Sequence, residues 1–355
     1  MSKVLKVSNR WSTRLLLPCK VMQFDYFIGI DVSKATLDFA VARANQVLFH
    51  QQVSNDKKGI TMFLKALRQQ TKAPISQCLF CMEHTGIYNN PLLKALHQLS
   101  ASIWVERAVH IQESMGLTRG KTDQVDAKRI ALFAYKNRDE ARLWNPPRTV
   151  IAQLDRLTAQ RARLVKVIKQ LQTPLTDSKG FIDKADRKAE QQACAGSLKA
   201  LKTDLKSADK AIIELAQADP ELKRLFERVT SVIGISQITA AEIIVTTNEF
   251  RSITDPKKFA CYAGVVPFER SSGQRKGKPQ VSHMANKKVK SFLHLGAMSA
   301  IQHCTQLKAY YQRKVAEGKN KMLVLNNVRN KLVLRVFACV REDRNYDEKY
   351  MPALV

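Results

Sequence analysis

The chain has 355 residues, of which 45% are hydrophobic, so its composition excludes a disordered tail and allows two or three folded domains. Its formal net charge of +28 is too large for a typical metabolic enzyme and indicates a polyanionic partner, most simply a nucleic acid. No stretch approaches about 20 consecutive apolar residues, so the sequence predicts no membrane partner.

Residues 1–24 form a basic leader that we expect to be poorly ordered. It resembles a signal peptide, but its apolar run Leu15–Leu17 is too short and Lys20 follows closely, so we do not expect export. The seven cysteines are odd in number and irregularly spaced, which argues against a disulfide framework. Together these features predict a cytoplasmic protein, and the family resemblance described below implies a bacterial one associated with the nucleoid.

Residues 25–145 predict an RNase H-like (RuvC-like) domain, the α/β part of an α/β plus all-α chain. Three strands in a meander come first, strands and helices then alternate, and a helix closes the domain, which is the order of that fold. We expect strands at Tyr26–Ile30, Leu37–Val41, Gln46–Val53, Ile75–Met82 and Ile103–Val109, and helices at Gly59–Gln69, Pro91–Leu99 and Thr122–Asn137.

Residues 146–222 show apolar residues at alternating spacings of four and three on two charged segments. Such heptad seams predict a coiled-coil helical hairpin used as a linker or for dimerisation, with a turn around Thr173–Gly180. Residues 223–355 return to a compact, mainly helical pattern. Within them Val229–Val245 resembles a helix-hairpin-helix with its turn at Gly234, although Ile233 and Ser236 replace the usual proline and second glycine.

Four carboxylates occupy particular places in the predicted α/β domain. Asp31 ends the first strand, Glu83 ends the fourth, and Asp123 and Asp126 share one face of the closing helix. Because the first and fourth strands are neighbours in an RNase H-like sheet, we expect all four to converge and to repel one another unless a cation pairs them. Hard oxygen ligands select Mg²⁺ or Mn²⁺, and two such ions can clamp a phosphodiester. The alternative is structural: turn residues at the strand ends, and Asp123 as a helix cap.

Four motifs make the sequence resemble the DEDD transposases of the insertion-sequence 110 family. They are GIDVSKATLD, MEHTGIYNNPL, GKTDQVDAKRIA and FACYAGVVPFERSSGQRKGK. The resemblance extends from about Tyr26 to the C-terminus; the departures are His84, the altered turn at Gly234 and the basic extension. It implies that Asp31, Glu83, Asp123 and Asp126 form the catalytic tetrad and that Ser272 is a catalytic serine, with Ser271 as the alternative nucleophile.

The resemblance also implies a recombinase that circularises and inserts a mobile element, guided by a structured RNA that the element encodes. The serine lies in a basic segment that we expect to be a loop, whose cations would neutralise DNA phosphates. Strand exchange between two duplexes needs at least two active sites, so we expect a homo-oligomer, at least a dimer. The residues expected to contact nucleic acid are Arg270, Arg275, Lys276, Lys278, Lys287 and Lys288.

Two other functions are open from the sequence. A RuvC-like metal-dependent nuclease or Holliday-junction resolvase would use the carboxylates and water, and the serine would be dispensable. A non-catalytic nucleic-acid-binding protein would use the positive charge alone. The carboxylates weigh against the second function, and the serine segment weighs against the first.

Overall fold

The computed structural model describes residues 24–115, 122–272, 275–282 and 284–349, so the predicted leader at 1–24 lies almost entirely outside the described residues. The chain divides into two compact units, Met1–Pro146 and Pro147–Val355. Residues 146–222, expected from the sequence to form a region of their own, contribute Ile151, Leu154 and Ile212 to the core of the second unit. Almost all of that region therefore belongs to the second unit.

A five-stranded sheet in the order β3-β2-β1-β4-β5 forms the centre of the first unit. The first three strands pair antiparallel, and β1 pairs with β4, and β4 with β5, in parallel. This arrangement confirms the predicted meander and the pairing of the first and fourth strands. The strands are β1 (Tyr26–Val32), β2 (Thr36–Arg43), β3 (Gln46–Ser54), β4 (Cys78–Glu83) and β5 (Ser102–Glu106).

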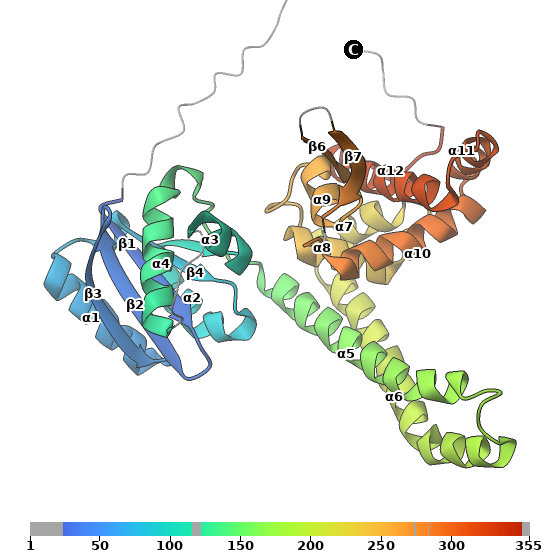
Figure 1. The fold of residues 1–355 in the computed structure, drawn as a ribbon, viewed down its shortest axis with the longest axis horizontal. Coiled ribbons are helices and arrows are strands. Elements are labelled where there is room, and N and C mark those ends of the chain that lie inside the picture. Colours follow the sequence, from blue (N-terminus) through green and yellow to red (C-terminus); the bar gives the residue numbers. More distant parts are fainter. Residues whose placement is uncertain (1–23, 116–121, 273–274, 283, 350–355) are drawn as a thin grey trace, which may run out of the picture. The chain divides into compact units, whose positions relative to one another are not determined.

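Helices cover both faces of this sheet, as the buried side chains at successive positions of β1, β2 and β4 require. One face packs against apolar residues of α1 and α2, and the other against α4, which lies across β1 and β2 (Figure 1). The predicted strand at Ile103–Val109 is too long, because Val109 belongs to a helix that the sequence did not reveal. The helices are α1 (Lys57–Thr71), α2 (Asn90–Gln98), α3 (Ala108–Met115) and α4 (Asp123–Lys136), with short 3-10 turns η1 (Ile75–Gln77), η2 (Gly86–Asn89) and η3 (Arg138–Glu140).

Two long helices begin the second unit, α5 (Thr149–Asp177) and α6 (Lys184–Ala218), and they pack side by side (Figure 1). The helix α5 continues five residues into the predicted turn around Thr173–Gly180 and includes Pro174. Arg161, which interrupts the apolar seam of α5, donates from Nε to Asp209 Oδ1 of α6 at 2.5 Å. Arg161 therefore joins the two helices through an ion pair with Asp209. That the two helices form a coiled coil stays a prediction.

The remaining elements of the second unit enclose one apolar core. The turn predicted at Gly234 exists, with a φ of 101°, and a Cβ there would lie 2.5 Å from the Gly296 carbonyl oxygen of α10. Ser236 caps α8 by accepting from Thr239 N, which explains a serine at the usual glycine position. The elements are α7 (Pro220–Thr230), α8 (Gln237–Thr247), α9 (Pro256–Tyr262), β6 (Pro267–Ser272), β7 (Arg275–Val281), α10 (Lys287–His303), α11 (Thr305–Ala316) and α12 (Lys321–Arg341).

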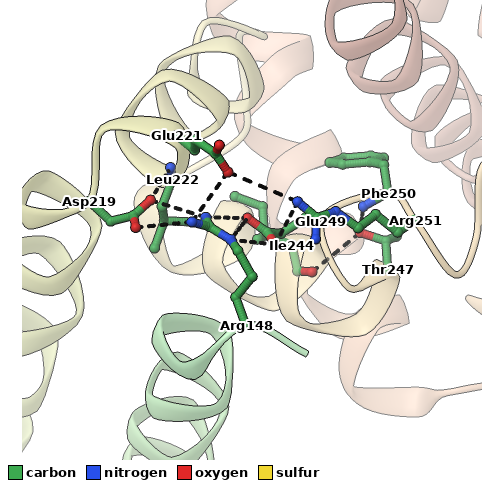
Figure 2. Close-up of polar contacts among 9 residues, drawn as sticks. All are labelled: Arg148, Asp219, Glu221, Leu222, Ile244, Thr247, Glu249, Phe250 and Arg251. Carbon is green, nitrogen blue, oxygen red and sulfur yellow. Dashed lines mark hydrogen bonds and ion pairs between the residues drawn. The ribbon is translucent and has the colours of Figure 1, made fainter. Parts of the chain in front are cut away.

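A polar cluster holds the first turn of α5 to the rest of this unit. The Arg148 guanidinium lies among three carboxylates, those of Asp219, Glu221 and Glu249 (Figure 2). It donates to both oxygens of Asp219 at 3.0 Å and lowers the pKa of that carboxyl below its usual range. Glu249 has a side chain only 5% exposed and a left-handed φ of 57°, so the arginine compensates a buried charge at a strained turn.

None of the helices in the described ranges is long and apolar enough to cross a membrane.

Candidate carboxylate site and serine hairpin

Asp31 and Glu83 lie on neighbouring parallel strands at the same edge of the sheet. Ile30 and Met82 are register partners, and the next residue on each strand is Asp31 on β1 and Glu83 on β4. Side by side at the carboxyl ends of two parallel strands, they occupy the place predicted for two of the four carboxylates.

The first turn of α4 supplies the other two carboxylates. Thr122 caps this helix by accepting from Val125 N at 3.3 Å, which leaves Asp123 and Asp126 in the first turn. The helix can approach the sheet because Gly29 of β1 has no side chain: a Cβ there would lie 2.1 Å from Ala131 N. Gly29 therefore determines how closely the α4 carboxylates approach the strand that carries Asp31.

The electrostatics of Asp31 show that the four carboxylates share one neighbourhood. Its pKa is raised from 3.8 to about 6, first by burial and then by the charges of Asp123, Asp126, Glu83 and Asp38. Like charges raise a carboxyl pKa only when they lie within interaction range. The structure thus places the other three predicted carboxylates around Asp31.

Asp38 is a fifth carboxylate at this site that sequence analysis missed. It is the register partner of Asp31 on β2 and is 3% exposed. Its Oδ1 lies 2.8 Å from His50 Nε2, and its Oδ2 accepts from Gln52 Nε2 at 2.9 Å. An open hollow of about 400 Å³ beside it is lined by Asp38, His50, Gln52, Thr122, Asp123 and Gln124. The available signal was a single acid within a buried apolar strand.

The donor set suits a hard divalent cation, since it consists of carboxylate oxygens at a partly buried edge. Among the residues that the structure describes, however, no three acidic, His or Cys side chains are already spaced to hold a metal ion. Asp126 Oδ1 instead accepts from Arg129 Nη1 at 2.9 Å. Joint coordination would therefore require the carboxylates to close in, with Asp126 leaving or sharing Arg129.

The segment expected to be a serine-bearing loop is a β-hairpin. In the backbone register of β6 and β7, Ser272 is opposite Arg275, Ser271 opposite Lys276, and Arg270 opposite Gly277. The strands escaped sequence analysis because their charged residues, Gly277 and Pro279 show no apolar alternation. The backbone thus pairs each serine with a basic residue. The described part of the chain excludes the side chains of Arg270, Ser271, Ser272, Arg275, Lys276 and Lys278.

The two lysines predicted to bind nucleic acid at the start of α10 differ in their surroundings. Lys287 is exposed. Lys288 Nζ lies 2.7 Å from Oε2 of Glu242, a residue only 6% exposed. Lys288 therefore neutralises a buried carboxylate in this structure, a role that its position in a basic segment did not reveal.

Comparison with known proteins gives two family matches and several full-length relatives. A model described as Transposase (DEDD_Tnp_IS110) matches residues 28–177, and one described as Transposase IS116/IS110/IS902 family matches residues 226–312. A pilin gene-inverting protein of Moraxella bovis is 24% identical and covers 91% of this chain and 98% of its own. An uncharacterized 44.8 kDa protein of insertion element IS116 from Streptomyces clavuligerus is 23% identical, with 90% and 95% covered.

Among solved structures, T. thermophilus RuvC in complex with a Holliday junction substrate matches 34% of this chain and 99% of its own. Its TM-score is 0.27 and its sequence identity is 11%.

Proposed function

Because this chain belongs to the IS116/IS110/IS902 transposase family, we propose that it cuts and rejoins DNA strands at the ends of a mobile insertion sequence with a carboxylate metal site and a serine nucleophile. The observation that carries the proposal is that Asp31 and Glu83 end neighbouring parallel strands and that Asp123 and Asp126 lie in the first turn of α4, which packs on those strands. Burial, together with the charges of these acids and Asp38, raises the pKa of Asp31 to about 6. A cluster of like charges destabilises a fold, so its presence favours a functional role.

Asp31, Glu83, Asp123 and Asp126 would hold Mg²⁺ or Mn²⁺. The bound ions would supply positive charge to the scissile phosphate and to the leaving oxygen. Asp38 does not need to coordinate: with His50 and Gln52 bonded to its two oxygens, it lies beside Asp31 on the neighbouring strand as a buried carboxylate. We assign it to orientation and charge balance at the site.

Ser272 would attack the phosphorus through its hydroxyl oxygen. The Oγ–P bond forms as one P–O bond to the adjoining nucleotide breaks, and the proton lost by serine is matched by the proton taken up by the leaving oxygen. The phosphoserine conserves the energy of the phosphodiester, so a hydroxyl of another strand can reverse the step without ATP. Ser271 is the alternative nucleophile, one residue earlier on the same strand.

The relatives favour rejoining over hydrolysis. A relative that covers 91% of this chain is named for inverting a pilin gene, and inversion requires that cut strands be rejoined. Arg270, Arg275, Lys276 and Lys278 would contact the DNA backbone, and Lys287 would extend that surface. We further propose that an element-encoded RNA guides the choice of target and that the active species is at least a dimer, because two duplexes must be held together.

A strand-transfer assay with element-end DNA, element RNA and Mg²⁺ tests this function. Asp31→Asn, Glu83→Gln, Asp123→Asn, Asp126→Asn and Ser272→Ala should each abolish transfer, whereas the matched exposed controls Asp139→Asn and Ser252→Ala should keep it. Robust transfer by any two of the carboxylate variants would exclude the metal site. Undiminished cleavage by Ser272→Ala would point instead to a hydrolytic nuclease or junction resolvase.

A further inference from the structure

The turn that follows Glu83 displays two large apolar side chains to solvent. In η2, between β4 and α2, Ile87 is 73% exposed and Tyr88 is 39% exposed, whereas the adjoining Asn89 is 1% exposed. Apolar side chains of this size are seldom displayed together beside a polar site unless they contact something. The turn is therefore a candidate contact surface at the carboxylate edge.

Hydrogen bonds tie this turn to the strand end that carries Glu83. The buried Asn89 donates from Nδ2 to the Glu83 carbonyl oxygen at 2.7 Å, and its Oδ1 accepts from Thr85 N at 3.1 Å. The two apolar side chains are thus presented by a turn that is bonded to the backbone of Glu83 itself.

A second tie joins the same turn to the strand end that carries Asp31. Asn55 donates from Nδ2 to the Tyr88 carbonyl oxygen at 3.0 Å and to the Ser33 carbonyl oxygen at 2.8 Å. Ser33 follows Asp31 by two residues. The backbone that bears Ile87 and Tyr88 is therefore fixed relative to both carboxylate-bearing strands, which is the arrangement expected of a preorganised contact surface.

The charges around the turn indicate what occupies it. Lys34 and His84, next to the two strand ends, are exposed, and the chain as a whole carries +28. A strand whose phosphate is held at the carboxylates would bring its neighbouring bases to this edge. An exposed tyrosine ring beside an aliphatic side chain suits the face of a base, and a base offers its face only when it is unpaired or unstacked.

We propose that Ile87 and Tyr88 form a stacking surface for an unpaired nucleobase next to the phosphodiester that the carboxylates hold. The inference rests on the proposed DNA strand transfer and deepens it. It assigns the site a preference for locally unpaired DNA over a continuous duplex.

Photo-crosslinking of the full-length protein tests the proposal. The probe is a single-stranded oligodeoxynucleotide with one 5-iodouracil, compared with the same strand in a complete duplex. We expect a cross-link in the peptide that contains Ile87 and Tyr88 with the single strand and little with the duplex. Tyr88→Ala should remove that cross-link and weaken single-strand binding roughly 5- to 100-fold, whereas Tyr88→Phe should keep both. Met62→Ala, which replaces an exposed apolar side chain on α1, is the control and should change neither.

Equal cross-linking of the single strand and the duplex, or an unchanged cross-link in Tyr88→Ala, would overturn the proposal. Cross-linking and strand-transfer assays of Asp31→Asn distinguish the proposed stacking surface from the proposed carboxylate function, because base stacking does not require catalysis. If that variant keeps both strand transfer and the Tyr88 cross-link, the carboxylate function fails and the stacking surface stands. If Asp31→Asn loses strand transfer, and neither this variant nor the unsubstituted protein forms the Tyr88 cross-link, the proposed stacking surface is wrong and the carboxylate function stands.

Discussion

At the scale of single residues, the central feature is a set of carboxylates whose mutual repulsion opposes folding. Asp31 is partly buried with four other acids in range, and these features raise its pKa to about 6. The folded state therefore binds a proton on Asp31 more tightly than the unfolded chain does, because the ordinary value is 3.8. Such a site is stable when protonated or when a cation is bound, and destabilised when it is charged and empty.

The raised pKa of Asp31 predicts how the stability of the metal-free protein depends on pH. Because the folded pKa is the higher one, the contribution of Asp31 to the unfolding free energy is full below pH 3.8 and falls as the pH rises to about 6. Asp31→Asn lacks that loss, so urea unfolding in chelator should show the variant gaining roughly 1–3 kcal/mol on the unsubstituted protein across this window. A difference that is constant with pH would show that Asp31 is not held among like charges.

At the scale of elements, the approach of α4 to the sheet decides where two of the carboxylates lie. Small residues make this contact: Gly29, Ala40 and Ala42 on the strands face Ala127 and Ala131 on the helix. A larger side chain on either side would separate the two elements and move the first turn of α4 away from Asp31. The packing of small residues is thus a condition of the site.

Gly29→Ala should therefore destabilise the protein and impair activity together. The new Cβ would meet backbone atoms of α4, Ala131 N at 2.1 Å and Ala127 O at 2.2 Å, so the helix must shift. We expect a loss of about 1–3 kcal/mol in chemical unfolding and a large fall in strand transfer. The control is Gly196→Ala in α6, where a Cβ meets nothing within 4 Å; it should gain about 0.5–1 kcal/mol. Equal behaviour of the two variants would contradict the packing account.

The polar cluster at the start of α5 gives a second prediction for the elements. Arg148→Ala removes the closest partner of the buried Glu249 and leaves Arg251 at 3.7 Å, so the unfolding free energy should fall by about 3 kcal/mol. The matched control is Arg313→Ala, whose partner Glu317 lies one helical turn away and is exposed, and it should cost less than about 0.5 kcal/mol. Similar losses in the two variants, compared by thermal or urea unfolding, would mean that the Arg148 cluster contributes no more than a surface pair.

Sequence patterns predicted the features that depend on residues close together in the chain and missed those that depend on contacts between elements. Apolar runs predicted the sheet strands and their meander, since each run can be recognised without knowing which strands it pairs with. The β6–β7 hairpin was not predicted, because it is defined by pairing between its strands and shows no apolar pattern. Asp38, Asn89 and Gly29 escaped for the same reason: each acts through a partner on another element. The positions of the four carboxylates on strand ends and on one helix face could be predicted from local sequence, and the order of strands in the expected fold then predicted that they converge. They are Asp31, Glu83, Asp123 and Asp126.

At the scale of the whole molecule, positive charge is distributed over a chain with two separate units. An excess of 28 positive charges is sufficient for binding that releases many counterions, without any reading of sequence. Specificity must therefore come from elsewhere, and an RNA guide would supply it by base pairing.

The charge predicts a steep salt dependence with an identifiable share from the hairpin. A plot of the logarithm of the DNA association constant against the logarithm of salt concentration should be linear. Replacing Lys276 and Lys278 together with Ala should make the slope shallower by about two units. Replacing Lys288, which pairs with Glu242, should change the slope little and lower stability instead. An unchanged slope in the double variant would mean that the hairpin does not contact DNA.

We propose above all that DNA strands are transferred through a phosphoserine whose formation depends on the carboxylate site. The most direct measurement is to incubate labelled element-end DNA with the protein, element RNA and Mg²⁺, denature the mixture, and map any DNA-linked peptide by mass spectrometry. We predict an adduct on Ser272 that is absent with chelator, in Ser272→Ala and in Asp31→Asn. Cleaved DNA with free ends and no adduct on either Ser272 or Ser271 would contradict the claim and show hydrolysis by water.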